Sequence, residues 1–140
     1  MNERQFIEDK IKIYFEIEEH NCAVCVIKVL SERFDFPIEQ QTLDACLAQN
    51  GLGQYGAQCG LITGATMFLG IVAAQNNWEK EKLYLHTREL TALFEKKFKS
   101  LLCSAIRPEG FHEDNPPYIC QPRTVDALEI FIDYLKIHLD

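Results

Sequence analysis

The sequence predicts an all-α fold: a single domain over residues 1–140, in which about five to six helices form a bundle around a buried, glycine-containing central helix. Apolar residues recur at helical spacing along most of the 140-residue chain, 47% of which is hydrophobic, as expected for one compact domain. The nearly apolar stretch 61–74, LITGATMFLGIVAA, is shorter than the roughly 20 residues that a membrane-spanning helix needs. We therefore expect it to be an interior helix. The chain contains no internal repeat and no long linker.

Three helices are expected before the central one. Residues 3–19 have apolar positions at helical spacing, although KIKIYFEIE within them also alternates with a period of two, as strands do. We interpret this segment as a helix. Asn21 is a suitable N-cap for a second helix over residues 22–34, and a third over residues 38–49 ends at Asn50-Gly51.

The central helix and two further helices complete the bundle. Residues 59–75 are apolar on nearly all sides, which indicates a helix surrounded by neighbours. Residues 78–99 alternate apolar positions with Lys and Glu, the pattern of a peripheral amphipathic helix. Residues 107–123 are rich in Pro, Gly and acidic side chains and predict a loop, which a last helix over residues 124–138 follows.

The charge of the chain excludes several classes of partner. Its formal net charge is −7 and no cluster of Lys and Arg offsets it, so binding to nucleic acid or to an anionic membrane surface is not expected. The first residues, MNERQFIEDKIK, lack the apolar segment of a secretory signal. We expect a cytoplasmic protein that does not insert into membranes.

Six cysteines are the main anomaly of this composition, because a reducing compartment keeps thiols free unless they bind metal or do chemistry. Cys22 follows the predicted cap, and Cys59 stands at the predicted start of the central helix. A thiol at a helix N-terminus has a lowered pKa, because unpaired amides and the helix dipole stabilise its thiolate. Cys22 and Cys59 are therefore expected to be low-pKa thiols.

Cys22 and Cys25 form a CxxC motif, a spacing that allows either a disulfide or a shared metal ion. Val26 stands where covalent haem attachment needs His, so no covalent haem is expected. The sequence has no second CxxC to support a zinc ribbon and no βαβ pattern to support a thioredoxin fold.

Three glycines, Gly56, Gly60 and Gly64, are spaced by four and would form a groove free of side chains on a helix. Another backbone or a cofactor could approach closely there, so Gly60 and Gly64 are candidate cofactor-binding residues. The simpler alternative is that the glycines permit tight helix packing and that Cys59 is a small core residue.

The other cysteines and the histidines have weaker signals. Cys103 has Arg107 one turn later as a possible counter-charge, and Cys120 lies in the predicted loop, whereas Cys46 is interpreted as a core residue. His20 and His112 are possible ligands or proton carriers, and two more histidines are interpreted as helix-surface residues: His86 and His138.

The cysteine and glycine motifs together resemble a family of small redox-active proteins named for its pattern, C_GCAxxG_C_C. The matching segments are NCAVCVIKVL, CGLITGA, FKSLLC and YIC. The resemblance implies a small helical protein with a redox role, the family cysteines being Cys22, Cys59, Cys103 and Cys120. Leu61 replaces the usual Ala of the motif, and Cys25 and Cys46 are additional, so the working pair is not defined.

Three functional hypotheses follow. The first is a redox protein that cycles between dithiol and disulfide or passes electrons to an unknown redox partner; Cys22 and Cys59 would react first, and Cys25, Cys103 or Cys120 would resolve. The second is a module in which Cys22, Cys59, Cys103 and Cys120 bind zinc or an iron–sulfur cluster. The third is a helical interaction protein, a homodimer with core cysteines. Both of the first two require these four cysteines to meet at one end of the bundle.

Overall fold

The structure, a computed structural model, describes residues 2–116 and 118–139, so Met1, Pro117 and Asp140 of the predicted domain lie outside the described residues. The described residues form helices and no strand, which confirms the all-α prediction. The helical elements are α1 (Glu3–Lys12), η1 (Ile13–Ile17), α2 (Cys22–Phe34), α3 (Gln40–Ala45), α4 (Gly51–Gln54), α5 (Gly60–Gln75), α6 (Lys80–Phe98), α7 (Cys103–Ile106) and α8 (Gln121–Leu139).

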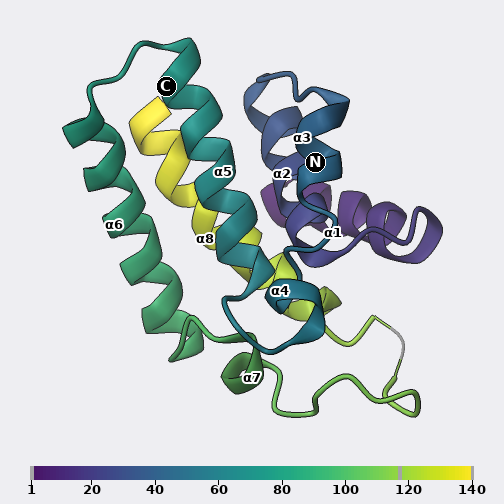
Figure 1. Ribbon diagram of the computed structural model, residues 1–140. Helices are drawn as coiled ribbons and strands as arrows, with labels where there is room; N and C mark the ends of the chain where they lie inside the picture. The colour runs from purple at the N-terminus through teal and green to yellow at the C-terminus, as the bar shows by residue number, and fades with distance from the viewer. Residues whose placement is uncertain (1, 117, 140) are drawn as a thin grey trace.

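Helix α5 is the predicted interior helix. It packs against α2, α6 and α8, and none of its residues from 60 to 73 is exposed: buried residues cover more than half of its circumference, and half-buried ones cover the rest. Figure 1 shows α5 beside α6 and α8 on one side and the N-terminal helices on the other, with α4, α7 and the 107–116 segment gathered at one end. The start of α5 lies at this end, close to the short helices and the loop.

Helix α2 begins and ends where the sequence predicts. The side chain of Asn21 accepts a hydrogen bond of 2.9 Å from the amide of Val24, as an N-cap does. The amide group of Asn21 also donates to the carbonyls of Cys46 and Leu47 at 3.0 and 3.1 Å. One side chain therefore fixes the start of α2 against the segment that follows α3.

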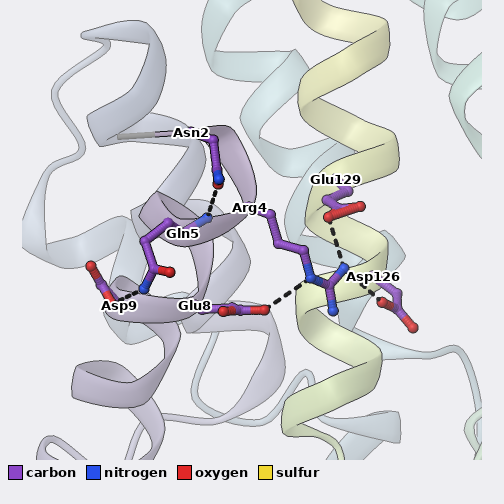
Figure 2. Close-up of polar contacts among 7 residues, drawn as sticks. All are labelled: Asn2, Arg4, Gln5, Glu8, Asp9, Asp126 and Glu129. Atoms are coloured by element: carbon purple, nitrogen blue, oxygen red, sulfur yellow. Dashed lines mark hydrogen bonds and ion pairs between the residues drawn. The ribbon is translucent and has the colours of Figure 1, made fainter.

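The first predicted helix is continuous, but its last turn is π-helical. The structure places α1 and η1 over residues 3–17, so the helical interpretation is correct and the strand alternative is not. Figure 2 shows how this helix is held: Asn2 caps it at Gln5, and Arg4 contacts Glu129 and Asp126 of α8 at 2.7 and 3.4 Å. Exposed pairs of this kind orient the two helices more than they stabilise them.

Other boundaries differ from the predictions. Helix α3 ends four residues earlier than expected, and α8 begins at Gln121 inside the predicted loop. Helix α7 is not predicted by the sequence pattern, because four residues are too short for a periodicity. None of the described helices has the length and apolar character needed to cross a membrane.

His86 is the one histidine whose predicted position is wrong. It is buried, 8% exposed, because Tyr134 and His138 of α8 cover this part of α6. Its Nδ1 atom lies 2.6 Å from the Tyr134 hydroxyl, so the buried ring has a hydrogen-bond partner. Burial, and next the neighbouring His138, lowers the pKa of His86.

Candidate functional site

A cavity of about 360 Å³ opens at the end of the bundle where α2, α5 and α7 begin. Four cysteines line it: Cys22, Cys59, Cys103 and Cys120. These are the four cysteines of the family pattern, and they come from four segments that are far apart in the sequence. The structure therefore brings all four to one cavity at one end of the bundle, as predicted.

Each of these cysteines stands at the N-terminus of a helix. Cys22 is the first residue of α2, Cys59 is the N-cap of α5, and Cys103 is the first residue of α7. Cys120 directly precedes α8, and its carbonyl accepts the amide of Thr124 at 2.9 Å. The cavity is thus the point at which four helix starts converge.

A short bridge fixes the segments of Cys59 and Cys103 against each other. Gln58 and Leu102 form an isolated antiparallel bridge, flanked by hydrogen bonds from the Cys59 amide to the Leu101 carbonyl, 2.8 Å, and from the Cys103 amide to the Ala57 carbonyl, 2.6 Å. Neighbouring residues of extended chain point to opposite faces. Since Gln58 and Leu102 are exposed, Cys59 and Cys103 both turn inward on the same face.

Glycines allow two of the sulfurs to pack against backbone. A Cβ atom on Gly60 would lie 2.5 Å from Cys22 Sγ and 2.8 Å from the Gln49 carbonyl oxygen. A Cβ atom on Gly51 would lie 3.0 Å from Cys103 Sγ. No larger residue fits at either position without displacing a sulfur or the backbone.

The groove predicted from the glycine spacing is only partly formed. Gly56 lies outside α5 in a left-handed conformation, so the row contains two helical glycines, Gly60 and Gly64. At Gly64 a Cβ atom would be 2.7 Å from the Ala23 carbonyl oxygen, so the backbone of α2 occupies this place. Of the two, only Gly60 lines the cavity, which limits contact with a small molecule to that end of α5.

Helix α4, beside the cavity, is a left-handed turn. Gly51, Leu52, Gly53 and Gln54 have φ values of 66°, 57°, 64° and 68°. Left-handed conformations cost L-residues other than glycine roughly 1–2 kcal/mol each. Leu52 and Gln54 therefore carry strain, and the turn they form places Gly51 against Cys103.

The expectation of low-pKa thiols at Cys22 and Cys59 is wrong. Burial, and next the neighbouring Cys59, raises the pKa of Cys22. Burial raises the pKa of Cys59 to about 11, although the amides of Leu61 and Ile62 at the helix start act in the opposite direction. The free energy that it costs to remove a thiolate from water exceeds the stabilisation that these amides give to the thiolate. The pKa of Cys103 is also raised, again mainly by burial.

Cys120 has a different environment. It is half-buried, and Nη1 atoms of two arginines, Arg107 and Arg123, each lie 3.7 Å from its sulfur. Arg107 acts on Cys103 as the expected counter-charge, against the burial that raises the pKa of that thiol, but its direct sulfur contact is with Cys120. The role of Arg123 was missed, although its position three residues after Cys120, at the start of a helix, could have indicated it.

Cys25 and Cys46 lie outside the cavity. Cys25 is fully buried, its sulfur lies 3.8 Å from the His20 carbonyl oxygen, and burial raises its pKa to about 12. Cys46 is fully buried with its sulfur 3.7 Å from Met67 Sδ, in agreement with the interpretation as a core residue. The CxxC motif therefore contributes one sulfur to the cavity and one to the interior.

The two histidines considered as ligands or proton carriers, His20 and His112, both line the cavity. His20 Nε2 lies 3.2 Å from Glu18 and 3.3 Å from Lys28 Nζ, so its ring is held in place. In the part of the chain that the structure describes, no three His, Cys, Asp or Glu side chains are placed closely enough to hold a metal ion.

The fold and the site define a small all-α protein in which four helix starts bring four thiols into one cavity. The family model described as "Putative redox-active protein (C_GCAxxG_C_C)" matches residues 20–134, and the chain belongs to this family. The resemblance read from the cysteine pattern is thereby confirmed. No curated protein and no solved structure matches the chain.

Proposed function

We propose that the protein is a thiol redox protein whose working groups are Cys22, Cys59, Cys103 and Cys120. The observation that carries this proposal is that these four cysteines, from four separate segments, line one cavity. Membership of a redox-active family agrees with it. Core packing alone would not require four thiols to share a cavity that also holds two arginines.

The proposed reaction is thiol–disulfide exchange. Two protein thiols lose two protons and two electrons to form one disulfide, while the disulfide of a substrate takes up both and becomes two thiols. The raised pKa values of Cys22 and Cys59 disfavour them as the first thiols to react, because the thiolate is the attacking form. This reverses the order in which the sequence placed these cysteines.

Binding of zinc or an iron–sulfur cluster by the same four thiolates is the competing proposal. Such a centre needs its ligands close together and deprotonated. The described residues contain no group of three ligands at metal-binding distances. This observation favours thiol exchange over metal binding.

The test is a thiol and metal count on protein purified without oxygen. We expect six free thiols and no stoichiometric metal; a mild oxidant should then lower the mass by about 2 Da for each disulfide formed. The variant Cys46→Ser, in which the changed residue lies outside the cavity, should still form the disulfide. Replacement by Ser of either cysteine in the linked pair should prevent it. Stoichiometric zinc or iron, removed by a chelator with loss of helix content, would show the metal-binding function instead.

The cytoplasmic setting and the homodimer are further parts of this proposal. Two exposed apolar residues on the same face of α6, Leu85 and Leu93, support association through a helix face. Sedimentation equilibrium would give the oligomeric state, with a monomer at all concentrations contradicting the dimer.

A further inference from the structure

We propose that Cys120 is the entry thiol and that Arg107 binds a carboxylate group of the substrate, which is a small anionic disulfide. This inference rests on the proposed function, since it names the substrate class of the same cavity. It has its own geometric basis in the two arginines, and its own test.

Cys120 is the cavity thiol with cationic partners. Two guanidinium groups approach its sulfur at 3.7 Å, and the residue is half-buried at the edge of the loop. Cys59 and Cys103 are only 5% and 8% exposed, and Cys22 packs its sulfur against Gly60. The attacking thiol in exchange must be reached by the incoming disulfide, and the two guanidinium groups can hold an anionic disulfide beside this sulfur. Cys120 is thus placed to react first.

The two arginines are not equivalent. Arg123 is paired with Glu109 at 2.6 Å, so its charge is already matched. Arg107 donates through Nε to the Gly110 carbonyl at 2.8 Å, and its guanidinium carbon lies 4.0 Å from the centre of the Phe111 ring. Within the described ranges 2–116 and 118–139, no carboxylate lies within ion-pair distance of Arg107.

These contacts fix the plane of the Arg107 guanidinium, and the two arginines share one carboxylate, Glu109, which is ion-paired with Arg123, so one positive charge is left unmatched. A guanidinium has five N–H groups, and its fork binds a carboxylate through two parallel hydrogen bonds. The carbonyl contact and the stacking on Phe111 hold the fork in position before a ligand arrives, so less conformational freedom is lost on binding. Arg107 therefore has the features of an anion anchor.

The size of the cavity and the charge of the protein narrow the substrate class. A volume of about 360 Å³ is at the lower end of the range for small-molecule sites. The net charge of −7 repels anions from most of the surface, so an anionic molecule is attracted only where a local cation is unmatched. A small disulfide with a carboxylate, seated with one sulfur near Cys120, meets both conditions.

The reaction balances as two exchanges. The Cys120 thiolate attacks one substrate sulfur, a mixed disulfide forms, and the released substrate thiolate takes a proton. A second cavity thiol loses its proton and attacks Cys120 Sγ, which forms the protein disulfide and releases the second substrate thiol. The two electrons come from the two protein thiols, and the substrate disulfide is the oxidant.

The test compares two chromogenic disulfides that differ in charge: 5,5′-dithiobis(2-nitrobenzoate), which carries two carboxylates, and neutral 4,4′-dithiodipyridine. The initial rate of the first thiol is measured with each on the full-length reduced protein, and the ratio of the two rates is the readout. Because any change in the reactivity of the sulfur affects both reagents, the ratio isolates binding of the carboxylate. Arg107→Gln is compared with Arg88→Gln, which removes the same charge from the exposed face of α6.

We expect Arg107→Gln to lower the ratio about tenfold, as the loss of a hydrogen bond to a charged group does, and Arg88→Gln to leave it unchanged. Cys120→Ser should abolish the fast first reaction with both reagents. An unchanged ratio in Arg107→Gln, or a fast reaction that survives in Cys120→Ser, would overturn the inference. If the ratio falls but no disulfide forms within the protein, the anion site stands and the proposed redox function fails.

Discussion

Replacement of Gly64 by Ala tests the packing that holds the cavity together. The new Cβ atom would lie 2.7 Å from the Ala23 carbonyl oxygen and 3.1 Å from Val26 Cβ. Both atoms belong to α2, one residue after Cys22 and one turn further on. A backbone oxygen cannot rotate away, so α2 has to retreat by about 0.7 Å to restore an ordinary contact.

The magnitude follows from a matched substitution on the same helix. A Cβ atom on Gly70 of α5 would have nothing within 4 Å, so Gly70→Ala should stabilise the protein by about 1 kcal/mol through helix propensity alone. Gly64→Ala has the same propensity gain but adds overpacking, which costs about 1–3 kcal/mol. The difference between the two variants is therefore about 1–3 kcal/mol in favour of Gly70→Ala.

Urea unfolding followed by circular dichroism at the helix signal measures this difference directly. The midpoint of Gly64→Ala should fall below that of Gly70→Ala, with similar slopes for both proteins. Equal midpoints would refute the close approach of α2 and α5. They would also remove the reason why the motif needs glycine at this position.

Three further predictions concern glycine conformation and pH. Gly51→Ala should destabilise the protein more than Gly53→Ala, because both residues have positive φ but only Gly51 lies against Cys103; equal losses in thermal unfolding would contradict this. The folded-state pKa of Cys59, raised to about 11 by burial, exceeds the unfolded value of about 8.5, so the free energy of unfolding should fall as pH rises between these values. Cys59→Ser should show a shallower fall, and identical pH profiles would count against the buried thiol. The pKa of His86 is lowered, mainly by burial, so stability should fall as pH drops below about 6.5, and this dependence should weaken in His86→Gln.

Local signals account for the parts of the fold that the sequence predicts well. The Asn21 cap and the apolar periodicity that follows it are contained within a few residues, so the start and end of α2 could be read directly. The interior position of α5 follows from its apolar residues on all sides. The gathering of the four cysteines was expected because helix ends meet at the ends of a bundle.

The errors have a common cause, which is burial by segments distant in the sequence. The helix-start argument for Cys22 and Cys59 is correct locally, but the loop and α7 close over these thiols, and desolvation outweighs the helix dipole. The position of Arg107 beside Cys120 depends on the fold of the 107–116 segment, which has no periodicity to read. His86 was assigned to the surface for the same reason, since the distant α8 packs over its ring from one side and Trp78 from another.

The central claim is that the cavity thiols exchange with one another, and disulfide mapping tests it most directly. The reduced protein is treated with one equivalent of 4,4′-dithiodipyridine, free thiols are alkylated in denaturant, and the linked peptides are identified by mass spectrometry. We predict a link within one chain between two of Cys22, Cys59, Cys103 and Cys120, with Cys25 and Cys46 recovered in alkylated form. A link that involves Cys25 or Cys46 would contradict the account. Recovery of all six cysteines in alkylated form after the oxidant treatment, which would mean that no disulfide had formed, would also contradict it.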